Sequence, residues 1–581
     1  MRLTPTFTDS PLPLAEYPRP QFRRDSYLPL NGEWELAILS EERLPEVYDR
    51  RILVPYPPEA PASGIGRVTA PDETLAYRRT FTLPEGFFRG RLLAQFGAVD
   101  QVARVFLNGR EVGGHAGGYT PFEVDLTSAL RDGENELCVL CRDDADSPLF
   151  GRGKQRYRSG GIFYTPVSGI WQSVWLESTP AEALTGLRLL PDAAAGTLAV
   201  TPLGTREGSA VTVEVLDGDA LIASGECCVG GTLTLDVSAC ALWSVASPEL
   251  YRLRITLGED TVESYFGLRS FGKTEIKGKH YFTENGKPIF YNGLLDQGYW
   301  PEGILTPPSF RAVFLELSRV REMGFTMLRK HCKVEPALYY YYCDILGISV
   351  FQDMLNGGER ERGYRLVLAP FFNLHLDDGN YKKMGRGDPA SREQYRREAD
   401  EVQDTLYNTV SLSLYTPFNE AWGQFDAVAE TERLRARDPS RLYDHASGWQ
   451  DKGGGDLRSR HIYFRPARPK NDGRRILALT EFGGYSYAVP GHTFTARRFG
   501  YRSFRSPEAL TAAYLRLYRR EVIPAILREG LSATVYTQLT DIEDEINGLF
   551  TYDRLPKIPA EEIKRVNAEV AAAFRRSLEE K

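Results

Sequence analysis

The sequence predicts a multidomain protein in which two β-sandwiches precede a (β/α)8 barrel. Short alternating runs between turn signals fill the first part of the chain, as in Leu-Ala-Tyr-Arg-Arg-Thr-Phe-Thr-Leu (75–83), and such alternation is typical of half-buried strands. From about residue 273, strand-like runs alternate with helical patterns, as in a parallel sheet covered by helices. A chain of 581 residues also exceeds one ordinary core, so we expect about three domains.

Residues 1–180 are predicted to form an N-terminal sandwich of the jelly-roll type. Alternating runs recur at 101–107 and 136–141, and Asn108-Gly109 supplies a hairpin turn after the first of them. Residues 181–272 also contain β patterns without a convincing helix, at the spacing of a small immunoglobulin-like sandwich.

Residues 273–581 are predicted to form the catalytic barrel, whose active site would lie at the C-terminal ends of its strands. Helical patterns such as 310–324 and 509–520 separate most of the strand candidates. The long connection 355–411 is a candidate lid, and its tract 392–401 mixes charges as a solvated helix face does. The eight strand candidates are 289–297, 326–331, 348–354, 412–420, 443–448, 460–464, 477–483 and 533–539.

Composition restricts the class of partner. The net charge is −7 and no basic run stands out, so a nucleic-acid partner is not expected. The chain has no run of about 18 apolar residues, so no membrane span is expected, and its start has no apolar core for a signal peptide.

The seven cysteines are scattered, and Cys138 and Cys141 would point to opposite faces of a strand. We therefore expect reduced cysteines, a cytoplasmic protein and a small-molecule or oligosaccharide substrate, with homo-oligomerisation left open.

Two glutamates end apolar strand-like runs in the barrel region. Glu420 ends Leu-Ser-Leu-Tyr-Thr-Pro-Phe-Asn-Glu (412–420), and Glu481 ends Ile-Leu-Ala-Leu-Thr-Glu (476–481). A carboxylate at the end of a buried strand is costly to desolvate unless it faces a cleft. Two of them on one rim suit glycoside hydrolysis, because one acid protonates the leaving oxygen while the other carboxylate attacks the anomeric carbon. Structural hydrogen bonding is the alternative.

The motifs and the domain order resemble glycoside hydrolase family 2, the family of β-galactosidases, β-glucuronidases and β-mannosidases. The similar segments are 18–34, 105–122 and the two glutamate motifs. The resemblance implies a retaining mechanism in which Glu481 is the nucleophile and Glu420 the acid/base. It also implies that Asn419 hydrogen-bonds the sugar 2-hydroxyl, whereas a strand-end cap is the structural alternative.

Other polar and aromatic residues at predicted strand ends are candidate substrate contacts. Arg329 could brace the catalytic carboxylates or form a surface ion pair. Asp353 could bind sugar hydroxyls, and aromatic rings could stack on a pyranose or pack in the core. His331, His445 and His461 lie at predicted strand ends, where they could contact the sugar or have structural roles. The full set of candidate substrate contacts is Asn419, Asp353, Arg329, His331, His445, His461, Trp422, Trp449 and Tyr485.

No metal and no cofactor are expected. The large β-galactosidases of the family have Ser-His-Tyr-Pro after the arginine, whereas this chain has Lys-His-Cys-Lys at 330–333. The histidine spacing has no ligand signature, which disfavours a metal-dependent barrel hydrolase.

The sugar is less well defined by the sequence. The Asn-x-Lys signature of family β-glucuronidases is absent after the last strand, and the acidic stretch 541–545 would repel a uronate if it faced the site. A neutral sugar is therefore favoured, with a β-galactosidase-like enzyme first by analogy with the family. The alternatives are a β-glucuronidase or β-galacturonidase, in which Arg329, Lys330 or Lys333 pairs the carboxylate, and an arabinopyranosidase. A non-catalytic carbohydrate-binding protein is the alternative of another class.

Overall fold

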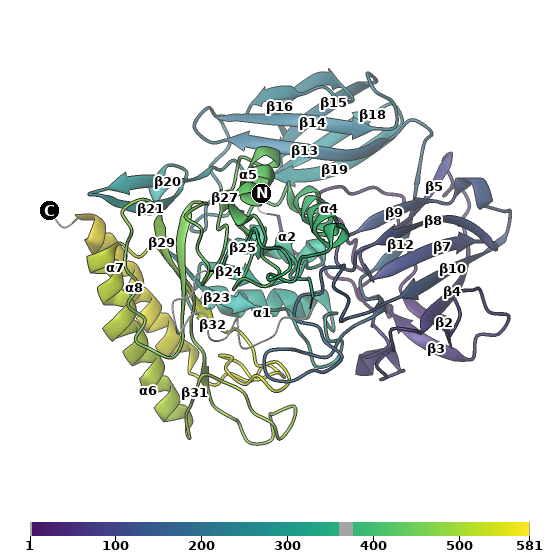
Figure 1. The fold of residues 1–581 in the computed structure, drawn as a ribbon. Helices are drawn as coiled ribbons and strands as arrows, with labels where there is room; N and C mark the ends of the chain where they lie inside the picture. Colours follow the sequence, from purple (N-terminus) through teal and green to yellow (C-terminus); the bar gives the residue numbers. More distant parts are fainter. Residues whose placement is uncertain (1–2, 360–375, 580–581) are drawn as a thin grey trace.

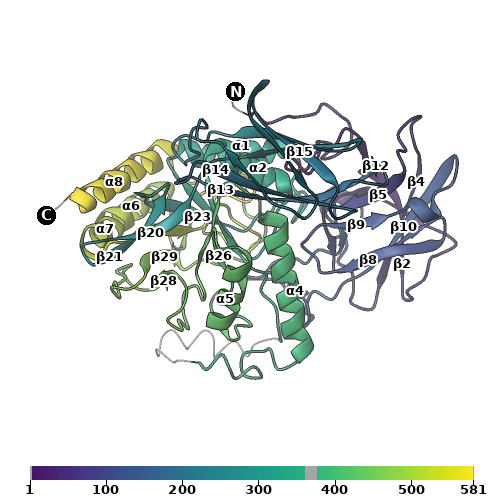
Figure 2. The same ribbon diagram turned by 90° about the horizontal axis from the view of Figure 1, so that it is seen from above.

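The computed structural model describes residues 3–359 and 376–579. Figure 1 shows a first group of antiparallel sheets on the right, a second group at the top, and a strand-and-helix body between them and the yellow C-terminal helices. Figure 2 shows the same arrangement from above, with α4 (Pro389–Leu406) lying between that body and the first group of sheets. The chain is therefore multidomain, with sandwich-type sheets followed by a mixed α and β part.

The first group contains two facing antiparallel sheets of the order β1-β12-β5-β9 and β3-β2-β4-β10-β7-β8, with β6 paired to β11. Apolar side chains of both sheets form one buried core, which includes the fully buried Trp34 and Val105. Cys138 and Cys141 belong to different clusters on opposite faces of β10, as their spacing predicted. The strands are β1 (Leu28–Pro29), β2 (Gly32–Leu39), β3 (Arg50–Val54), β4 (Thr74–Thr82), β5 (Arg91–Phe96), β6 (Val99–Asp100), β7 (Val102–Leu107), β8 (Arg110–Ala116), β9 (Phe122–Asp125), β10 (Glu134–Arg142), β11 (Gly169–Ile170) and β12 (Val174–Thr179).

The second group packs a sheet β13-β14-β17 against a sheet β16-β15-β18-β19. Valine and leucine side chains alternate inward along these strands, as in β18, where every second residue is buried. The strands are β13 (Leu184–Asp192), β14 (Thr197–Gly204), β15 (Ala210–Asp217), β16 (Ala220–Cys228), β17 (Leu233–Asp236), β18 (Tyr251–Leu257) and β19 (Asp260–Phe266).

The third part contains a nearly closed, barrel-like sheet. Its parallel strands follow the order β28-β29-β32-β23-β24-β25-β26-β27. The remaining gap between β27 and β28 is bridged by Asp456, whose backbone N–H donates to the carbonyl oxygen of Tyr443 at 2.7 Å. The strands are β23 (Tyr291–Asp296), β24 (Met327–Lys330), β25 (Ser349–Asp353), β26 (Leu412–Thr416), β27 (Leu442–Tyr443), β28 (Leu457–Ile462), β29 (Ile476–Gly483) and β32 (Ala533–Thr537).

Shorter strands extend this sheet or lie beside it, and helices cover its outside. The additional strands are β20 (Phe271–Ile276), β21 (Lys279–Glu284), β22 (Lys287–Pro288), β30 (Tyr485–Ser486) and β31 (Arg502–Ser503). The helices besides α4 are α1 (Phe310–Glu322), α2 (Ala337–Leu346), α5 (Ala427–Arg437), α6 (Pro507–Leu517), α7 (Ile523–Glu529) and α8 (Ala560–Glu579).

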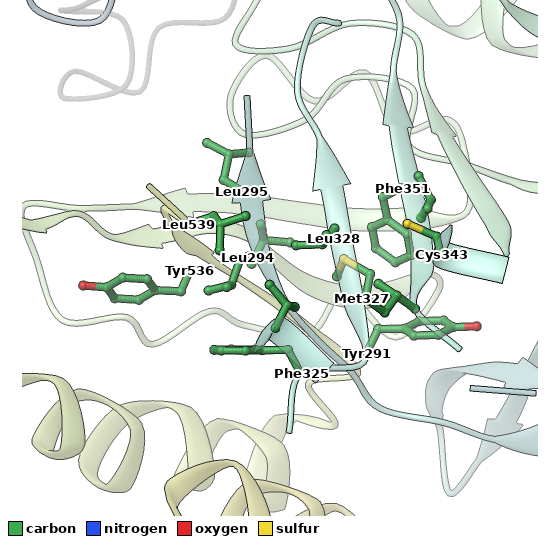
Figure 3. Close-up of a cluster of buried hydrophobic side chains, with 14 of the residues drawn as sticks. Tyr291, Leu294, Leu295, Phe325, Met327, Leu328, Cys343, Phe351, Tyr536 and Leu539 are labelled. Atoms are coloured by element: carbon green, nitrogen blue, oxygen red, sulfur yellow. The ribbon is translucent and has the colours of Figure 1, made fainter. Parts of the chain in front are cut away.

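Local sequence explains several of these boundaries. Helix α1 begins after Ser309, whose side-chain oxygen accepts the N–H of Ala312 at 3.1 Å. Helix α2 ends at Gly347, which takes the left-handed conformation at φ 69°. In Figure 3 apolar side chains of neighbouring strands gather in one buried cluster that includes Leu294, Leu328 and Phe351. Burying each such side chain contributes about 1.5–3 kcal/mol.

Each predicted barrel strand overlaps an observed one, but the tract 392–401 was interpreted incorrectly. It is helical within α4, yet Gln394, Tyr395 and Glu398 are buried, so only part of it is solvated. The carboxylate of Glu398 accepts the backbone N–H of Gly151 from the first group of sheets at 2.9 Å. The candidate lid 355–411 includes α4, and its residues 360–375 lie outside the described residues. No helix within the described ranges is long and apolar enough to cross a membrane.

Candidate active site

Glu420 and Glu481 both lie at the C-terminal edge of the barrel-like sheet. Strand β26 ends before Pro417, which has no N–H for a continued ladder. The chain then turns through left-handed conformations at Glu420 (φ 51°) and Ala421 (φ 65°). Such strained backbone needs support from its surroundings, and the N–H of Glu420 donates to the carbonyl oxygen of Ser447 at 2.9 Å. Glu481 lies within β29.

One arginine connects the residues around these carboxylates. Arg329 ends β24 and is 1% exposed. Its Nη1 donates to Oε1 of Glu481 at 3.1 Å and its Nε donates to Oδ1 of Asp353 at 2.9 Å. Its Nη2 donates to Oδ1 of Asn419 at 2.8 Å. Burial alone would lower the pKa of Arg329, but the carboxylates of Asp353 and Glu481 outweigh it and hold that pKa above its usual value.

His461 lies between the two glutamates. Strand register places it beside Glu481, and its Nδ1 lies 2.8 Å from Oε1 of Glu420 and 3.5 Å from Oε2 of Glu481. Its Nε2 lies 2.9 Å from the hydroxyl of Ser447. Burial, with a smaller contribution from the Arg329 cation, lowers the pKa of His461 to about 3 against the opposing effect of Glu481, so the imidazole is neutral at ordinary pH.

A tyrosine completes the surroundings of Glu481. The hydroxyl of Tyr463 donates to Oε2 of Glu481 and lies 2.9 Å from Oγ1 of Thr537. The Tyr463 ring stacks on Tyr501 with ring centroids 3.8 Å apart. Burial, and after it the charge of Glu481, raises the pKa of Tyr463 well above 10, so the phenol stays a donor. With Arg329, this hydroxyl gives Glu481 two donors, which stabilise a negative carboxylate.

A loop of the first group of sheets reaches the same rim. Phe163 stacks on Trp422 at a centroid distance of 5.3 Å, and Nζ of Lys154 lies 4.5 Å from the Trp422 ring centroid. Lys154 is 8% exposed, and among residues 3–359 and 376–579 its Nζ has no hydrogen-bond or ion-pair partner. Burial raises the pKa of Glu420, and the cation of Lys154 is the largest influence that opposes this.

Of the remaining residues that were predicted to contact the substrate, some lie beside the two glutamates and others do not. His331 is buried beside them, with Nδ1 2.5 Å from Oδ2 of Asp353, so both Asp353 oxygens are already engaged by protein groups. Trp449 packs edge-on against His461 at 6.0 Å. His445 lies apart, because its Nε2 accepts the backbone N–H of Lys452 at 2.9 Å.

Tyr485 also lies apart from the glutamates. It packs against Phe504 at a centroid distance of 5.2 Å, beside the short strand β31. The structure therefore brings neither His445 nor Tyr485 into contact with the two carboxylates.

Two clusters have the composition of a metal site. The ligand atoms of His331, Cys332 and Asp353 lie within 4.8 Å of one another, as do those of Glu420, His461 and Glu481. Arg329 bonds to a carboxylate of each cluster. One guanidinium already pairs with a carboxylate of each cluster, and a metal cation beside it would be repelled by its charge. The donor sets therefore fit a metal poorly.

The sequence reasoning missed Tyr463, Tyr501 and Lys154. Tyr463 follows His461 by two positions, so strand alternation could have placed both on one face. Lys154 had no such signal, because its loop belongs to a different group of sheets and only tertiary structure brings it to the rim.

The comparisons with known proteins agree with this architecture. The family models "Glycosyl hydrolases family 2, sugar binding domain" and "Glycosyl hydrolases family 2" match residues 47–180 and 199–269. A beta-galactosidase of Aeromonas hydrophila is 26% identical over 70% of this chain and 38% of its own length. The beta-galactosidase large subunit of Leuconostoc lactis is 28% identical over 64% of this chain and 58% of its own length. The chain spans 32% to 58% of the length of the first curated relatives it matches.

Solved structures show the same fold over nearly the whole chain. A beta-glucuronidase of Ruminococcus gnavus matches 94% of this chain and 98% of its own, with a TM-score of 0.75 and 17% identity. A beta-galacturonidase of Eisenbergiella tayi matches 94% of this chain and 97% of its own, with a TM-score of 0.70 and 19% identity. The two family models assign residues 47–180 and 199–269 to glycoside hydrolase family 2, and the solved structures show the same fold over nearly the whole chain.

Proposed function

We propose that this protein is a retaining, exo-acting β-glycosidase in which Glu481 is the nucleophile and Glu420 the acid/base. One observation carries the proposal: an oxygen of each carboxylate lies within 4.8 Å of an oxygen of the other. Retaining enzymes hold their two carboxyl groups about 5–5.5 Å apart, whereas inverting enzymes leave room for a water at about 6.5–9.5 Å. The short separation supports direct attack by one carboxylate.

The surroundings of the two glutamates differ in a way that suits the two proposed roles. Glu420 has a raised pKa because it is buried, so it can hold a proton for the leaving oxygen. Glu481 accepts hydrogen bonds from Arg329 and Tyr463, which favour a charged nucleophile.

The reaction then takes two steps with balanced protons. Glu481 bonds to the anomeric carbon while the glycosidic C–O bond breaks and Glu420 protonates the departing oxygen. Water next gives a proton to Glu420, attacks the same carbon, and releases Glu481.

Asn419 is placed to bind the sugar. Its Oδ1 is fixed by Arg329, and its buried Nδ2 has no hydrogen-bond partner among the described residues. A buried donor without a partner is costly, and a sugar hydroxyl would satisfy it. This supports the predicted contact with the 2-hydroxyl.

A β-galactosidase-like specificity stays our first candidate for the sugar, by analogy with the relatives named as beta-galactosidases. The cations that the sequence offered for a uronate are already paired. Lys330 contacts Asp296 and Glu335 at 2.7 Å, and Lys333 contacts Glu335 at 2.9 Å.

Lys154 favours a second candidate, a β-uronide such as a glucuronide or galacturonide. It is the nearly buried cation at this rim that lacks an anionic partner within the described ranges. A substrate carboxylate could supply that partner. The acidic stretch 541–545 opposes this less than its sequence suggests, because Asp541 pairs with Lys557 at 2.7 Å.

The proposal includes the finer architecture. We infer that residues 1–180 form a jelly-roll sugar-binding domain, 181–272 an immunoglobulin-like sandwich, and 273–581 a catalytic (β/α)8 barrel. The succession of parallel strands and outer helices in the third part supports the barrel assignment.

A panel of 4-nitrophenyl β-glycosides tests the function and identifies the sugar. The galactoside, glucuronide, galacturonide and arabinopyranoside are compared, and the configuration of the first product is followed by NMR. Glu481→Ala should abolish turnover on every substrate, since no glycosyl-enzyme can form. Glu420→Ala should slow the hydrolysis of a disaccharide far more than that of activated aryl glycosides, which need little protonation of the leaving group. Added azide should restore turnover of this variant, with a β-glycosyl azide as the product.

Three outcomes would contradict the proposal. Inversion of configuration would exclude the covalent mechanism. Full activity of Glu420→Ala on a disaccharide would exclude its acid role. Binding of sugars without any turnover would indicate a carbohydrate-binding protein.

A further inference from the structure

A cavity of about 510 Å³ beside the catalytic rim has four arginines in its lining. Its charged lining is Arg156, Arg158, Arg497, Arg498, Asp146 and Asp544. Four positive and two negative side chains leave a net charge of +2 in one small cavity. The whole chain carries −7, so this concentration of positive charge is local.

Three of these arginines are available to a ligand. Arg158, Arg497 and Arg498 are exposed, and no hydrogen bond or ion pair joins their guanidinium groups to another residue of the described ranges. Arg156 lies over the Phe163 ring at 4.1 Å. Asp544 accepts the hydroxyl of Thr495 and pairs with none of these three guanidinium groups within the described residues.

The cavity begins where the aromatic side chains around the catalytic residues end. Phe163 belongs to its wall and stacks on Trp422, which follows Glu420 by two positions. Phe499 also lines the cavity, and its ring centroid lies 5.4 Å from that of Tyr501.

Tyr501 in turn stacks on Tyr463, the donor to Glu481. One aromatic layer on each side therefore separates the cavity from the two glutamates. In an exo-acting enzyme the terminal sugar occupies the inner end of the site and the rest of the substrate extends outward, so this cavity lies on the leaving-group side.

We infer that the cavity is a subsite for an acidic sugar residue on the leaving-group side of the scissile bond. This inference rests on the proposed glycosidase function. Guanidinium groups bind carboxylates and sulfates in a bidentate manner, and the ring of Phe499 offers an apolar surface for a pyranose. The substrate class is an acidic oligosaccharide, carboxylated or sulfated, from whose non-reducing end the terminal sugar is removed.

The kinetic test compares two disaccharides that share the terminal sugar identified by the aryl panel. One is linked to galacturonate and the other to galactose. The triple variant Arg158→Gln/Arg497→Gln/Arg498→Gln changes exposed side chains only. Arg206→Gln is the matched control, an exposed arginine between β14 and β15 of the second group of sheets.

The wild type should show a kcat/KM about tenfold higher for the acidic disaccharide, as expected for two or three partly exposed charge pairs. The triple variant should reduce that ratio to about one, with the neutral disaccharide changed less than about twofold. High salt should reduce the ratio in the wild type, and the control should behave as wild type. An equal preference for both disaccharides, or an equal loss on both, would overturn the inference.

A binding measurement separates this inference from the function on which it rests. Calorimetry measures the affinity of the full chain and of its triple variant for three ligands: tri-galacturonate, a sulfated galactose trisaccharide and a neutral galactotriose. Tighter binding of either acidic trisaccharide, lost in the triple variant, would support the subsite even if no glycoside were hydrolysed, and the proposed function alone would then fail. Hydrolysis of aryl glycosides without such binding would leave the function and remove the subsite.

Discussion

The hydroxyl of Tyr463 offers a clean test of how the nucleophile is held. It donates to Oε2 of Glu481, while its ring stacks on Tyr501 at 3.8 Å. Tyr463→Phe removes the donor and keeps the stacking ring, so the shape of the site is preserved. The chain offers a matched control in Tyr415→Phe, because the buried hydroxyl of Tyr415 in β26 has no hydrogen-bond partner within the described residues.

The expected loss follows from the remaining contacts of Glu481. A hydrogen bond to a charged group contributes about 1.5–3 kcal/mol, and each 1.36 kcal/mol corresponds to about tenfold in rate. Since Arg329 still donates to the other oxygen at 3.1 Å, the nucleophile is weakened but not released. We expect kcat/KM on an aryl glycoside to fall about 10- to 100-fold.

A stability measurement adds a second readout. The thermal midpoint should stay near that of Tyr415→Phe. Unchanged kcat/KM, or a loss of activity that only follows a loss of folded protein, would refute the assignment of this hydroxyl to the nucleophile.

Three further predictions concern Lys154, the buried ion pair of Arg24, and the need for a metal. Lys154→Met should move the alkaline limb of the pH–rate profile to higher pH, because the Lys154 cation lowers the pKa of Glu420 and its removal raises that pKa; a shift to lower pH would contradict this. Arg24→Met removes the cationic partner of the buried Asp260 at 2.9 Å, whereas Glu177, which loses Arg24 at 3.1 Å, keeps Arg19 at 2.8 Å. The substitution should lower the free energy of unfolding by about 3–5 kcal/mol, seen as an earlier first transition in urea with unchanged kcat. Activity should survive dialysis against a chelator, and magnesium-dependent recovery after such treatment would refute the metal-free mechanism.

The sequence predicted the barrel strands well because their apolar runs are long and buried on both faces. Their ends were less predictable. The run 412–420 was expected to be one strand, but β26 stops at Thr416, before Pro417 and the left-handed turn at Glu420. The run 443–448 was expected to be a strand, but regular pairing covers only β27 (Leu442–Tyr443). Period-two alternation needs a regular strand, so it could not place the side chain of His445.

The sequence could likewise predict the positions of some site residues and not of others. Arg329 and His461 lie near the C-terminal ends of the strands β24 and β28, so their position on the rim could be predicted from the sequence. Arg329 donates to Glu481, and Nδ1 of His461 lies 2.8 Å from Glu420. Tyr485 follows β29 after two glycines in left-handed conformations, Gly483 and Gly484. Left-handed backbone interrupts the period-two alternation of the strand, so no local pattern could have indicated that the Tyr485 ring packs against Phe504.

The acidic residues after the last barrel strand anchor the loop that completes the rim. Thr165 donates its N–H to Glu543 at 2.9 Å, and the hydroxyl of Tyr164 donates to Glu545. Both donors belong to the same loop as Lys154. The stretch that the sequence indicated as a barrier to uronates therefore serves to position a cation.

The first group of sheets is thus part of the active-site wall. Arg152 of the same loop donates through Nη1 to the carbonyl oxygen of Gly358 at 2.9 Å, and Gly151 is held by Glu398 of α4. These contacts join the loop to two separate segments of the third part of the chain. A barrel produced without its N-terminal sandwich would lack Lys154, Phe163 and the arginines at 156 and 158. It would keep Glu420 and Glu481, the proposed catalytic residues, so its defects should appear in substrate recognition and in the pH dependence that Lys154 influences.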